Sequence, residues 1–262
     1  MEFCDTHCHL DLLKGIELDA ASMISPNVQY IAVTNAPYLY EPNRALFSKF
    51  TNVSVALGMH PQLVDQFGGQ LDKFASLLSQ TGWVGEIGLD GSPQSVGSLP
   101  RQREVFDQIL AMIAKGRSKI LSVHTRGAER EAIQTLHNHL ADTDSRVVLH
   151  WYSGPASVAA SAIEHGYFFS VNHRMLNSAR GKRILEVVPI DRILTETDAP
   201  FTFDQSVFSQ RTSLATTVSQ LATLYGIELE TMVTKIRSNL DHLMIHSTGE
   251  SSTLRSPVQP SQ

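Results

Sequence analysis

Residues 3–11 read FCDTHCHLD, a run in which two histidines are separated by a single cysteine and have an aspartate on either side. Side chains alternate between the two faces of a strand, so His7 and His9 share one face and Cys4 and Cys8 the other. If the histidines point at the centre of a sheet or barrel, the cysteines point at the helices around it. We therefore expect the cysteines to be core residues and the histidines to be functional.

The same pattern recurs along the chain, because short apolar runs repeatedly lead into stretches of helical periodicity such as 101–116 and 128–140. This βα alternation is typical of a parallel sheet, and eight strands close a TIM barrel. The sequence thus predicts the α/β class and a single-domain (β/α)8 TIM barrel. The eight expected strands are 2–7, 28–35, 53–60, 83–89, 119–124, 146–151, 167–172 and 192–197.

Length and composition agree with one globular domain. The chain has 262 residues, of which 42% are hydrophobic and 18% charged. Barrels of about 200 to 250 residues commonly fold as one unit, so we assign residues 1–247 to the barrel and expect 248–262 to be a disordered tail. No run of about eighteen apolar residues occurs, and we expect a cytoplasmic protein without a membrane anchor.

The charge and the cysteine content exclude several classes of protein. A net charge of −5 leaves no general basic surface for non-specific phosphate binding, so any phosphate is held by metal ions or by a few arginines. Two cysteines are too few for a disulfide framework or a zinc finger. The candidates for a local basic patch are Arg101, Arg103, Arg126 and Arg174.

Metal-binding side chains stand at the ends of most of the predicted strands. The carboxyl ends of barrel strands meet at one face, so these side chains converge. Imidazole and carboxylate suit Zn²⁺ or, with more oxygen, Mn²⁺ and Mg²⁺. Two ions about 3.5 to 4 Å apart need about six protein ligands and a bridging carboxylate, for which Glu86 is the candidate. The six predicted ligands are His7, His9, Glu86, His124, His150 and Asp198.

Other polar residues have competing interpretations. His60 ends the third expected strand, and taken alone it is more readily a hydrogen-bonding residue than a ligand. Glu196 shares a face with Asp198 and is expected to orient a ligand histidine. His173 stays undecided. The remaining histidines lie in helical or loop stretches and are expected at the surface: His137, His139, His165, His242 and His246.

Seven motifs, in family order over most of the chain, together resemble the TatD family of metal-dependent deoxyribonucleases within the amidohydrolase-like barrels. The resemblance implies a barrel with two divalent ions that hydrolyses phosphodiester bonds through a metal-activated water, often as an exonuclease on DNA. The motifs are DTHCHLD (5–11), GMHP (58–61), GEIGLD (85–90), QREVF (102–106), VHTR (123–126), HWYSG (150–154) and PIDRILTETDAPF (189–201).

The resemblance also implies a role for each matching residue. Asp198 would orient or deprotonate the nucleophile, and His60 would sit near the phosphate or a nearby water. Arg126 is either a bidentate phosphate clamp or a surface salt-bridge residue. One ion would be held by His7, His9, Glu86 and Asp198, and the other by Glu86, His124 and His150.

Several positions depart from the family pattern. Gln62 stands where many members have a second histidine, and Gly91–Pro93 stand where an aromatic residue is usual. Trp151 and Tyr152 replace a common cysteine and phenylalanine and are the candidates for base stacking instead. The loop after Phe201 lacks the usual asparagine-glutamate-proline stretch. We expect an altered substrate preference with the metal centre intact.

Two other functions stay open. A hydrolase of small-molecule amides or esters uses the same barrel, although such enzymes often bridge their ions with a carboxylated lysine that these motifs do not supply. A subunit of a larger assembly, such as an anti-phage defence complex, would have protein partners encoded in a defence or repair operon. A nuclease with a DNA substrate is the function that we favour, since all six candidate ligands are present.

Overall fold

The computed structural model describes residues 2–204 and 209–245. All eight predicted strands are confirmed, and most end before the predicted run does, because the last residues turn into the loops that carry the polar side chains. The predicted tail, 248–262, lies outside the described residues. The strands are β1 (Phe3–Cys8), β2 (Val28–Ala32), β3 (Val53–Val55), β4 (Trp83–Gly88), β5 (Ile120–His124), β6 (Arg146–His150), β7 (Phe168–Val171) and β8 (Ile193–Thr195).

The strands are parallel and follow one another in chain order, as β1-β2-β3 and β4-β5-β6-β7-β8. Backbone contacts join the two groups on both sides. Leu57 forms a parallel bridge with Val84 between β3 and β4, and the Asp198 amide donates to the His7 carbonyl across β8 and β1 at 2.8 Å. The eight strands therefore close a barrel, which confirms the predicted fold class.

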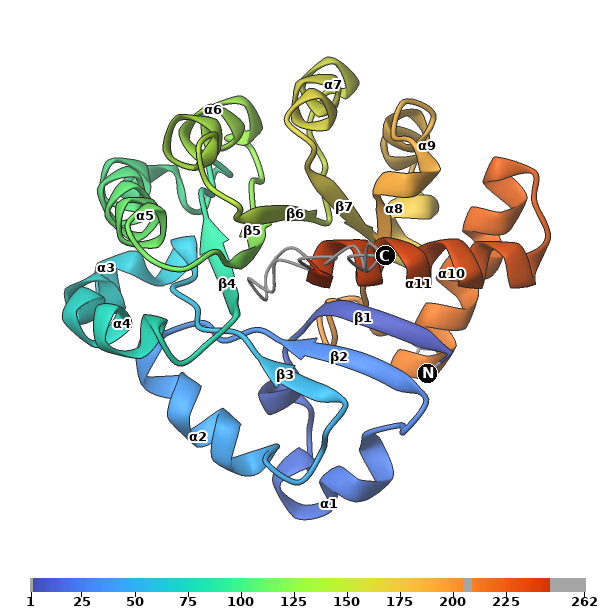
Figure 1. The fold of residues 1–262 in the computed structure, drawn as a ribbon, viewed down its shortest axis with the longest axis horizontal. Coiled ribbons are helices and arrows are strands. Elements are labelled where there is room, and N and C mark those ends of the chain that lie inside the picture. Colours follow the sequence, from blue (N-terminus) through green and yellow to red (C-terminus); the bar gives the residue numbers. More distant parts are fainter. Residues whose placement is uncertain (1, 205–208, 246–262) are drawn as a thin grey trace, which may run out of the picture.

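Helices form a ring around the barrel, except that α11 crosses one end of it (Figure 1). The two segments predicted from periodicity form α5 and α6. The periodicity puts Val105, Ile109, Met112 and Ile113 on one face of α5, and all of them are buried except Met112, which is half-buried. The helices are α1 (Ile16–Met23), α2 (Tyr40–Leu46), α3 (Val64–Phe67), α4 (Leu71–Leu78), α5 (Leu99–Ala114), α6 (Glu129–Leu140), α7 (Ala156–Glu164), α8 (His173–Leu176), α9 (Ala179–Leu185), α10 (Gln210–Tyr225) and α11 (Leu229–Ile245).

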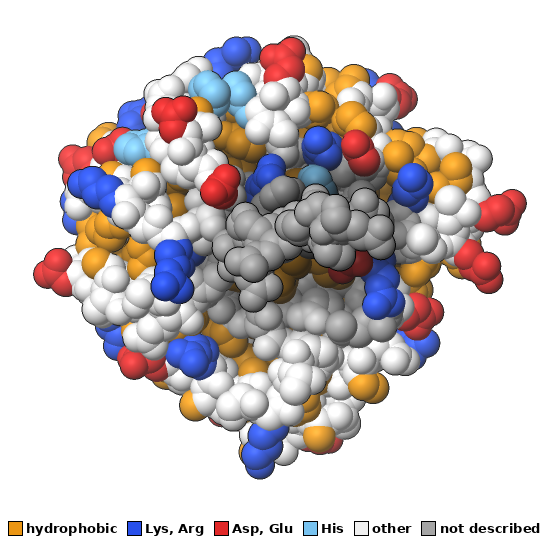
Figure 2. Space-filling view, viewed as in Figure 1, with side chains coloured by type: hydrophobic (Ala, Val, Ile, Leu, Met, Phe, Trp, Pro, Cys, Tyr) orange, Lys and Arg blue, Asp and Glu red, His pale blue; other side chains and the backbone are white. Residues whose placement is uncertain are grey.

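The amino end of the barrel is filled by apolar side chains. Leu243 of α11 is fully buried and packs in one cluster with Trp83, Phe168 and Leu194 from the strands. Figure 2 shows the face over which α11 lies, where Lys and Arg side chains are interspersed with Asp and Glu. Among the described residues, no helix is long and apolar enough to cross a membrane.

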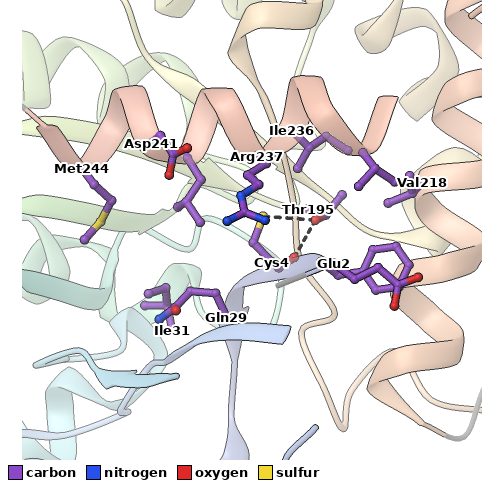
Figure 3. Close-up of a pocket in the computed structure, with 13 residues that line it drawn as sticks. Glu2, Cys4, Gln29, Ile31, Thr195, Val218, Ile236, Arg237, Asp241 and Met244 are labelled. Carbon is purple, nitrogen blue, oxygen red and sulfur yellow. Dashed lines mark hydrogen bonds between the residues drawn. The ribbon is translucent and has the colours of Figure 1, made fainter. Parts of the chain in front are cut away.

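A cavity of about 310 Å³ lies between α11 and strands β1, β2 and β8 (Figure 3). Cys4 lines it, and its thiol sulfur lies 3.5 Å from the Thr195 hydroxyl. Cys8 is also buried, and its thiol donates to the Ile31 carbonyl at 3.5 Å. Both cysteines thus belong to the core, as the strand alternation predicts.

Candidate metal centre

All six predicted ligands meet at the carboxyl end of the barrel. His7 lies on β1, Glu86 on β4, and His124 and His150 end β5 and β6. Five of the six line a cavity of about 500 Å³. The sixth, His7, is fully buried beneath it. Parallel strands that are far apart in the sequence therefore bring these side chains to one point, as the barrel geometry requires.

Glu86 lies at the middle of this cluster, with its two carboxylate oxygens directed to different partners. Oε2 is 3.5 Å from His7 Nε2 and 3.4 Å from His9 Nε2. Oε1 is 2.8 Å from His124 Nδ1 and 2.9 Å from His150 Nε2. The carboxylate thus separates the ligands into two groups, one on each oxygen.

The first group consists of His7, His9 and Asp198. Asp198 Oδ1 lies 3.7 Å from His7 Nε2 and 3.5 Å from His9 Nε2. His7 Nε2 has no hydrogen-bond partner among the described residues although it is buried. Four ligands about 2.1 Å from one tetrahedral ion lie about 3.4 Å from one another. These spacings, and the unpartnered nitrogen, fit a divalent cation better than they fit direct hydrogen bonds.

The Asp198 carboxylate is held in place by its own backbone. Asp198 has φ of 49°, a left-handed conformation that is uncommon outside glycine. The preceding residue, Thr197, donates from its amide and its hydroxyl to the Asp5 carboxylate at 2.8 and 2.6 Å. Burial raises the pKa of Asp5 to about 7, although these hydrogen bonds act in the opposite direction. Such local strain is retained where the surrounding structure and the function require it.

The second group contains His124 and His150. His124 Nε2 lies 2.9 Å from Asp90 Oδ2. An ionised carboxylate only accepts, so Nε2 carries the proton, and a neutral ring leaves the lone pair on Nδ1 facing Glu86 Oε1. Two acceptor atoms 2.8 Å apart require a proton or a cation between them. The described geometry therefore also suits a cation at this group.

His60 joins the second group but differs in its tautomer. His60 Nδ1 accepts a hydrogen bond from the Gln62 amide at 3.1 Å. A neutral ring that accepts at Nδ1 carries its proton on Nε2. That Nε2 lies 3.3 Å from Glu86 Oε1 and faces the cavity. His60 is thus arranged as a hydrogen-bond donor, whereas His124 is arranged as a ligand.

Other side chains lie beside the ring nitrogens of two candidate ligand histidines. Ser122 Oγ lies 2.8 Å from His7 Nδ1, and Glu196 Oε2 lies 3.7 Å from His150 Nδ1. Asn172 donates to the other oxygen of Glu196 at 2.8 Å. Such partners fix the ring that binds a metal and raise its basicity. At 3.7 Å, Glu196 Oε2 lies beyond hydrogen-bond distance of His150 Nδ1, which has no hydrogen-bond partner among the described residues, so the orienting role of Glu196 stays a prediction.

Asp90 is a residue of the site that sequence reasoning missed. Its Oδ2 accepts from Gln62 Nε2 at 2.7 Å and lies against His124. The Asp90 backbone is held by Gln102, which accepts from its amide at 2.7 Å and donates to its carbonyl at 3.0 Å. The sequence did contain a signal for this contact, because Asp90 is the last residue of the GEIGLD motif and Gln102 is the first residue of QREVF. Gln62, a departure from the family pattern, is part of this support.

Charge coupling within the centre shifts the pKa values of its members. Burial alone raises the pKa of Glu86, but the neighbouring His60, His150 and His7 hold it well below its ordinary range. Burial lowers the pKa of His9, yet the neighbouring Asp198 and Glu86 carboxylates outweigh this effect and raise that pKa to about 9. Without metal, protons on the histidines balance the charge of the carboxylates, and bound metal ions would replace these protons.

The predicted substrate-binding residues lie in two different environments. Arg126 and Trp151 line the cavity together with Phe201, whose ring lies 5.2 Å from that of His9. Trp151 has φ of 36° directly after His150, which places it at the rim. Tyr152 is buried, and its hydroxyl donates to the Pro155 carbonyl at 2.9 Å. The structure thus brings Trp151 to the site but places Tyr152 in the packing of its own loop.

The four arginines expected to form a basic patch are dispersed. Arg101 pairs with Glu104 at 2.8 Å, Arg103 pairs with Glu131, and Arg174 donates to the Thr202 carbonyl. Of the four, Arg126 lines the cavity. The loop after Phe201 lies partly outside the described residues, so its predicted change of shape stays a prediction.

The fold and the ligand set define a TIM barrel whose carboxyl end is suited to divalent cations. The sequence model of the TatD related DNase family matches residues 4–244, and the chain belongs to that family.

Relatives and solved structures agree with this assignment. An uncharacterised metal-dependent hydrolase of Methanocaldococcus jannaschii is 27% identical over 77% of this chain and 80% of its own length. The human deoxyribonuclease TATDN3 is 30% identical over 57% of this chain and 55% of its own length. The structure of the TatD homologue YJJV from Escherichia coli k12 covers 92% of this chain and 97% of its own, with a TM-score of 0.79 at 22% identity. At that identity the structure shows the shared fold.

Proposed function

We propose that the protein is a metal-dependent nuclease that hydrolyses phosphodiester bonds with two divalent ions, acting as an exonuclease on DNA. The observation that carries the proposal is the position of Glu86, which directs one oxygen to the His7 and His9 group and the other to the His124 and His150 group. A shared carboxylate between two such groups is typical of two-metal sites. When bound, such ions act as Lewis acids that activate water and neutralise charge on phosphoryl oxygens.

The residues around these groups divide the proton transfers between them. The Asp198 carboxylate is 8% exposed and reaches the cavity, so it accepts a proton from the attacking water. His60 carries its proton on Nε2 at the same cavity, so it donates to the phosphate or to the leaving oxygen. Hydrolysis of a phosphodiester needs one group that takes the proton of the attacking water and another that protonates the leaving oxygen, and Asp198 and His60 line the same cavity.

The rim of the cavity supports a nucleic acid as the substrate. Trp151 and Phe201 offer aromatic surfaces beside the centre, and base stacking on such rings is worth about 1 to 3 kcal/mol per base. Arg126 lies exposed at the same rim and offers a planar guanidinium to a phosphate. The family relationship and the names of the relatives favour DNA over other phosphodiesters.

The experiment that tests the proposal is the cleavage of end-labelled single-stranded oligonucleotides by chelated protein to which Mg²⁺, Mn²⁺ or Zn²⁺ is returned. We expect a ladder from one end with wild type and a loss of at least about 10⁴-fold in rate with Glu86→Ala. Glu104→Ala, which removes an exposed carboxylate from α5, serves as the matched control and should cleave as wild type does. Wild type that binds metal yet cleaves no oligonucleotide would favour a small-molecule hydrolase or a subunit that needs partners.

A further inference from the structure

A second cavity, of about 580 Å³, adjoins the metal centre on the same face of the barrel. The loops after β4, β5 and β6 form it together with α9. Arg126 and Ser153 line both this cavity and the one that holds the predicted ligands. The two cavities therefore share a wall, and a chain-like ligand that leaves the metal centre over this wall enters the second cavity.

Three arginines line the second cavity, Arg126, Arg180 and Arg183, and we call it the arginine groove. All three side chains are exposed. Arg180 donates to the Ser153 carbonyl at 3.2 Å. The guanidinium groups of Arg126 and Arg183 have no hydrogen-bond or ion-pair partner within residues 2–204 and 209–245. Three like-charged side chains gathered at one cavity form a local anion site in a chain whose net charge is −5.

One acidic residue also lines the arginine groove, but it is partly engaged elsewhere. Glu129 accepts from the Gly127 amide at 3.0 Å and is half-buried. Three guanidinium groups against one carboxylate leave the groove with a positive excess. The groove thus differs from the face that α11 covers, where basic and acidic side chains are interspersed (Figure 2).

The loops that line the groove pack closely against one another. The Gly91 amide donates to the Arg126 carbonyl at 2.8 Å. A Cβ atom at Gly91 would lie 2.5 Å from the Gly127 carbonyl oxygen, so these loops pack too closely for a side chain. Helix α7 begins at Ala156 on the groove, behind Pro155, which supplies no side-chain cap. Backbone amides at a helix start favour anions, in addition to the arginines.

We propose that the arginine groove binds the phosphodiester backbone of the nucleotides beyond the scissile phosphate, so that Arg180 and Arg183 select polynucleotide chains over short phosphodiesters. This inference rests on the proposed nuclease function. A guanidinium fork matches phosphate oxygens bidentately without reading a base, so the groove confers preference for length and not for sequence. Trp151 and Phe201 then contact the bases near the centre while the groove holds the backbone that leads away from it.

The test separates binding from cleavage. The affinity of a fluorescein-labelled octathymidylate is measured by anisotropy, over a range of salt concentrations, for full-length protein kept in chelator. We expect Arg183→Gln to weaken binding about three- to tenfold and to reduce the salt slope by about 0.7. Lys182→Gln removes one positive charge from the neighbouring position of α9 but not from the groove. It is the matched control and should leave both quantities unchanged.

A second measurement compares substrates of different length with metal-loaded protein. In Arg183→Gln, kcat/KM should fall at least about threefold more for the octanucleotide than for a dinucleotide, and the double variant Arg180→Gln/Arg183→Gln should widen the difference. Equal losses on the two substrates, or equal losses in Lys182→Gln, would overturn the groove while leaving the nuclease function intact. The nuclease function alone would be overturned if wild type bound the octanucleotide through these arginines but failed to cleave it in the presence of any of the metals.

Discussion

The two ends of the barrel differ in what they bury: apolar side chains at the amino end, and charged and polar side chains at the carboxyl end. At the amino end, Leu243 of α11 packs with Trp83 and Phe168 in a closed apolar cluster. At the carboxyl end, His7 and Glu86 are buried among like and unlike charges, and ring nitrogens remain without partners among the described residues. Apolar burial stabilises a fold, whereas unpaired buried polar groups cost stability. The amino end therefore supports the fold that holds the carboxyl end in an otherwise unfavourable arrangement.

The comparison predicts that changes at the carboxyl end alter the reaction more than the fold. His60→Ala should lower kcat by about 10²- to 10⁴-fold while the metal content of the protein stays that of wild type, because His60 is arranged as a proton donor. His124→Ala, which removes a predicted ligand on the same carboxylate, should lose metal as well as activity. Metal analysis and steady-state kinetics on both variants check this. Loss of metal from His60→Ala would make His60 a ligand and contradict the tautomer argument.

Changes at the amino end should do the reverse. Leu243→Ala should lower the free energy of unfolding by about 2 to 5 kcal/mol, since it removes a fully buried side chain from the cluster that closes the barrel. The folded fraction should retain the kcat of wild type. Leu224→Ala on α10, where the side chain is 36% exposed, is the control and should cost less than about 1 kcal/mol. Urea unfolding followed by circular dichroism measures both. A parallel fall in kcat at native conditions would mean that the two ends are coupled.

The fold was predictable because each strand carries its own signal. Residue alternation and eight apolar runs are local features, and they predicted the barrel and the cysteines in its wall. The meeting of the six candidate ligands was predictable because the carboxyl ends of parallel strands must converge. His173 shows the limit of this reasoning: it follows β7, yet its Nδ1 lies 2.9 Å from Ser213 Oγ of α10 and not at the centre.

What the sequence did not reveal depends on contacts between distant loops. Arg126 and Arg183 line one cavity although α6, α7 and α8 stand between them in the chain, and no spacing rule connects them. Arg101 and Arg103 were predicted to belong to the same basic patch as Arg126. They lie instead on the outer face of α5, where they pair with Glu104 and Glu131. The charge of a residue is visible in a sequence, but the side of a helix on which it lies relative to a loop is set by packing.

Asp90 tests how far the supporting layer contributes to the centre. Asp90→Asn should weaken metal binding about 10- to 100-fold, because the amide no longer fixes the His124 proton on Nε2. Asp107→Asn is the matched control, since Asp107 pairs with His139 at 2.7 Å on the exposed side of α5 and α6. Competition against a chromogenic chelator measures both affinities. Equal metal affinities in the two variants would mean that Asp90 serves only the packing of its loop. Metal binding would then depend on the candidate ligands alone.

The smallest expected effect concerns the protons that the metal-free centre holds. Because Asp198 and Glu86 raise the pKa of His9 to about 9, this ring is protonated at neutral pH in the metal-free protein. A ligand histidine must be neutral, so metal binding releases its proton, and affinity should rise with pH up to about 9, by at most about tenfold per pH unit for this group.

The same pKa has a consequence for stability. A raised pKa stabilises the folded metal-free chain below the unfolded value of about 6.5, and that contribution is lost as the pH rises through about 9. Titration calorimetry in two buffers of different ionisation enthalpy counts the released protons. His9→Gln should release about one proton fewer than wild type when an ion binds. If His9→Gln released as many protons as wild type, His9 would already be neutral in the metal-free protein. The buried charges at the carboxyl end would then cost less stability than their spacing indicates.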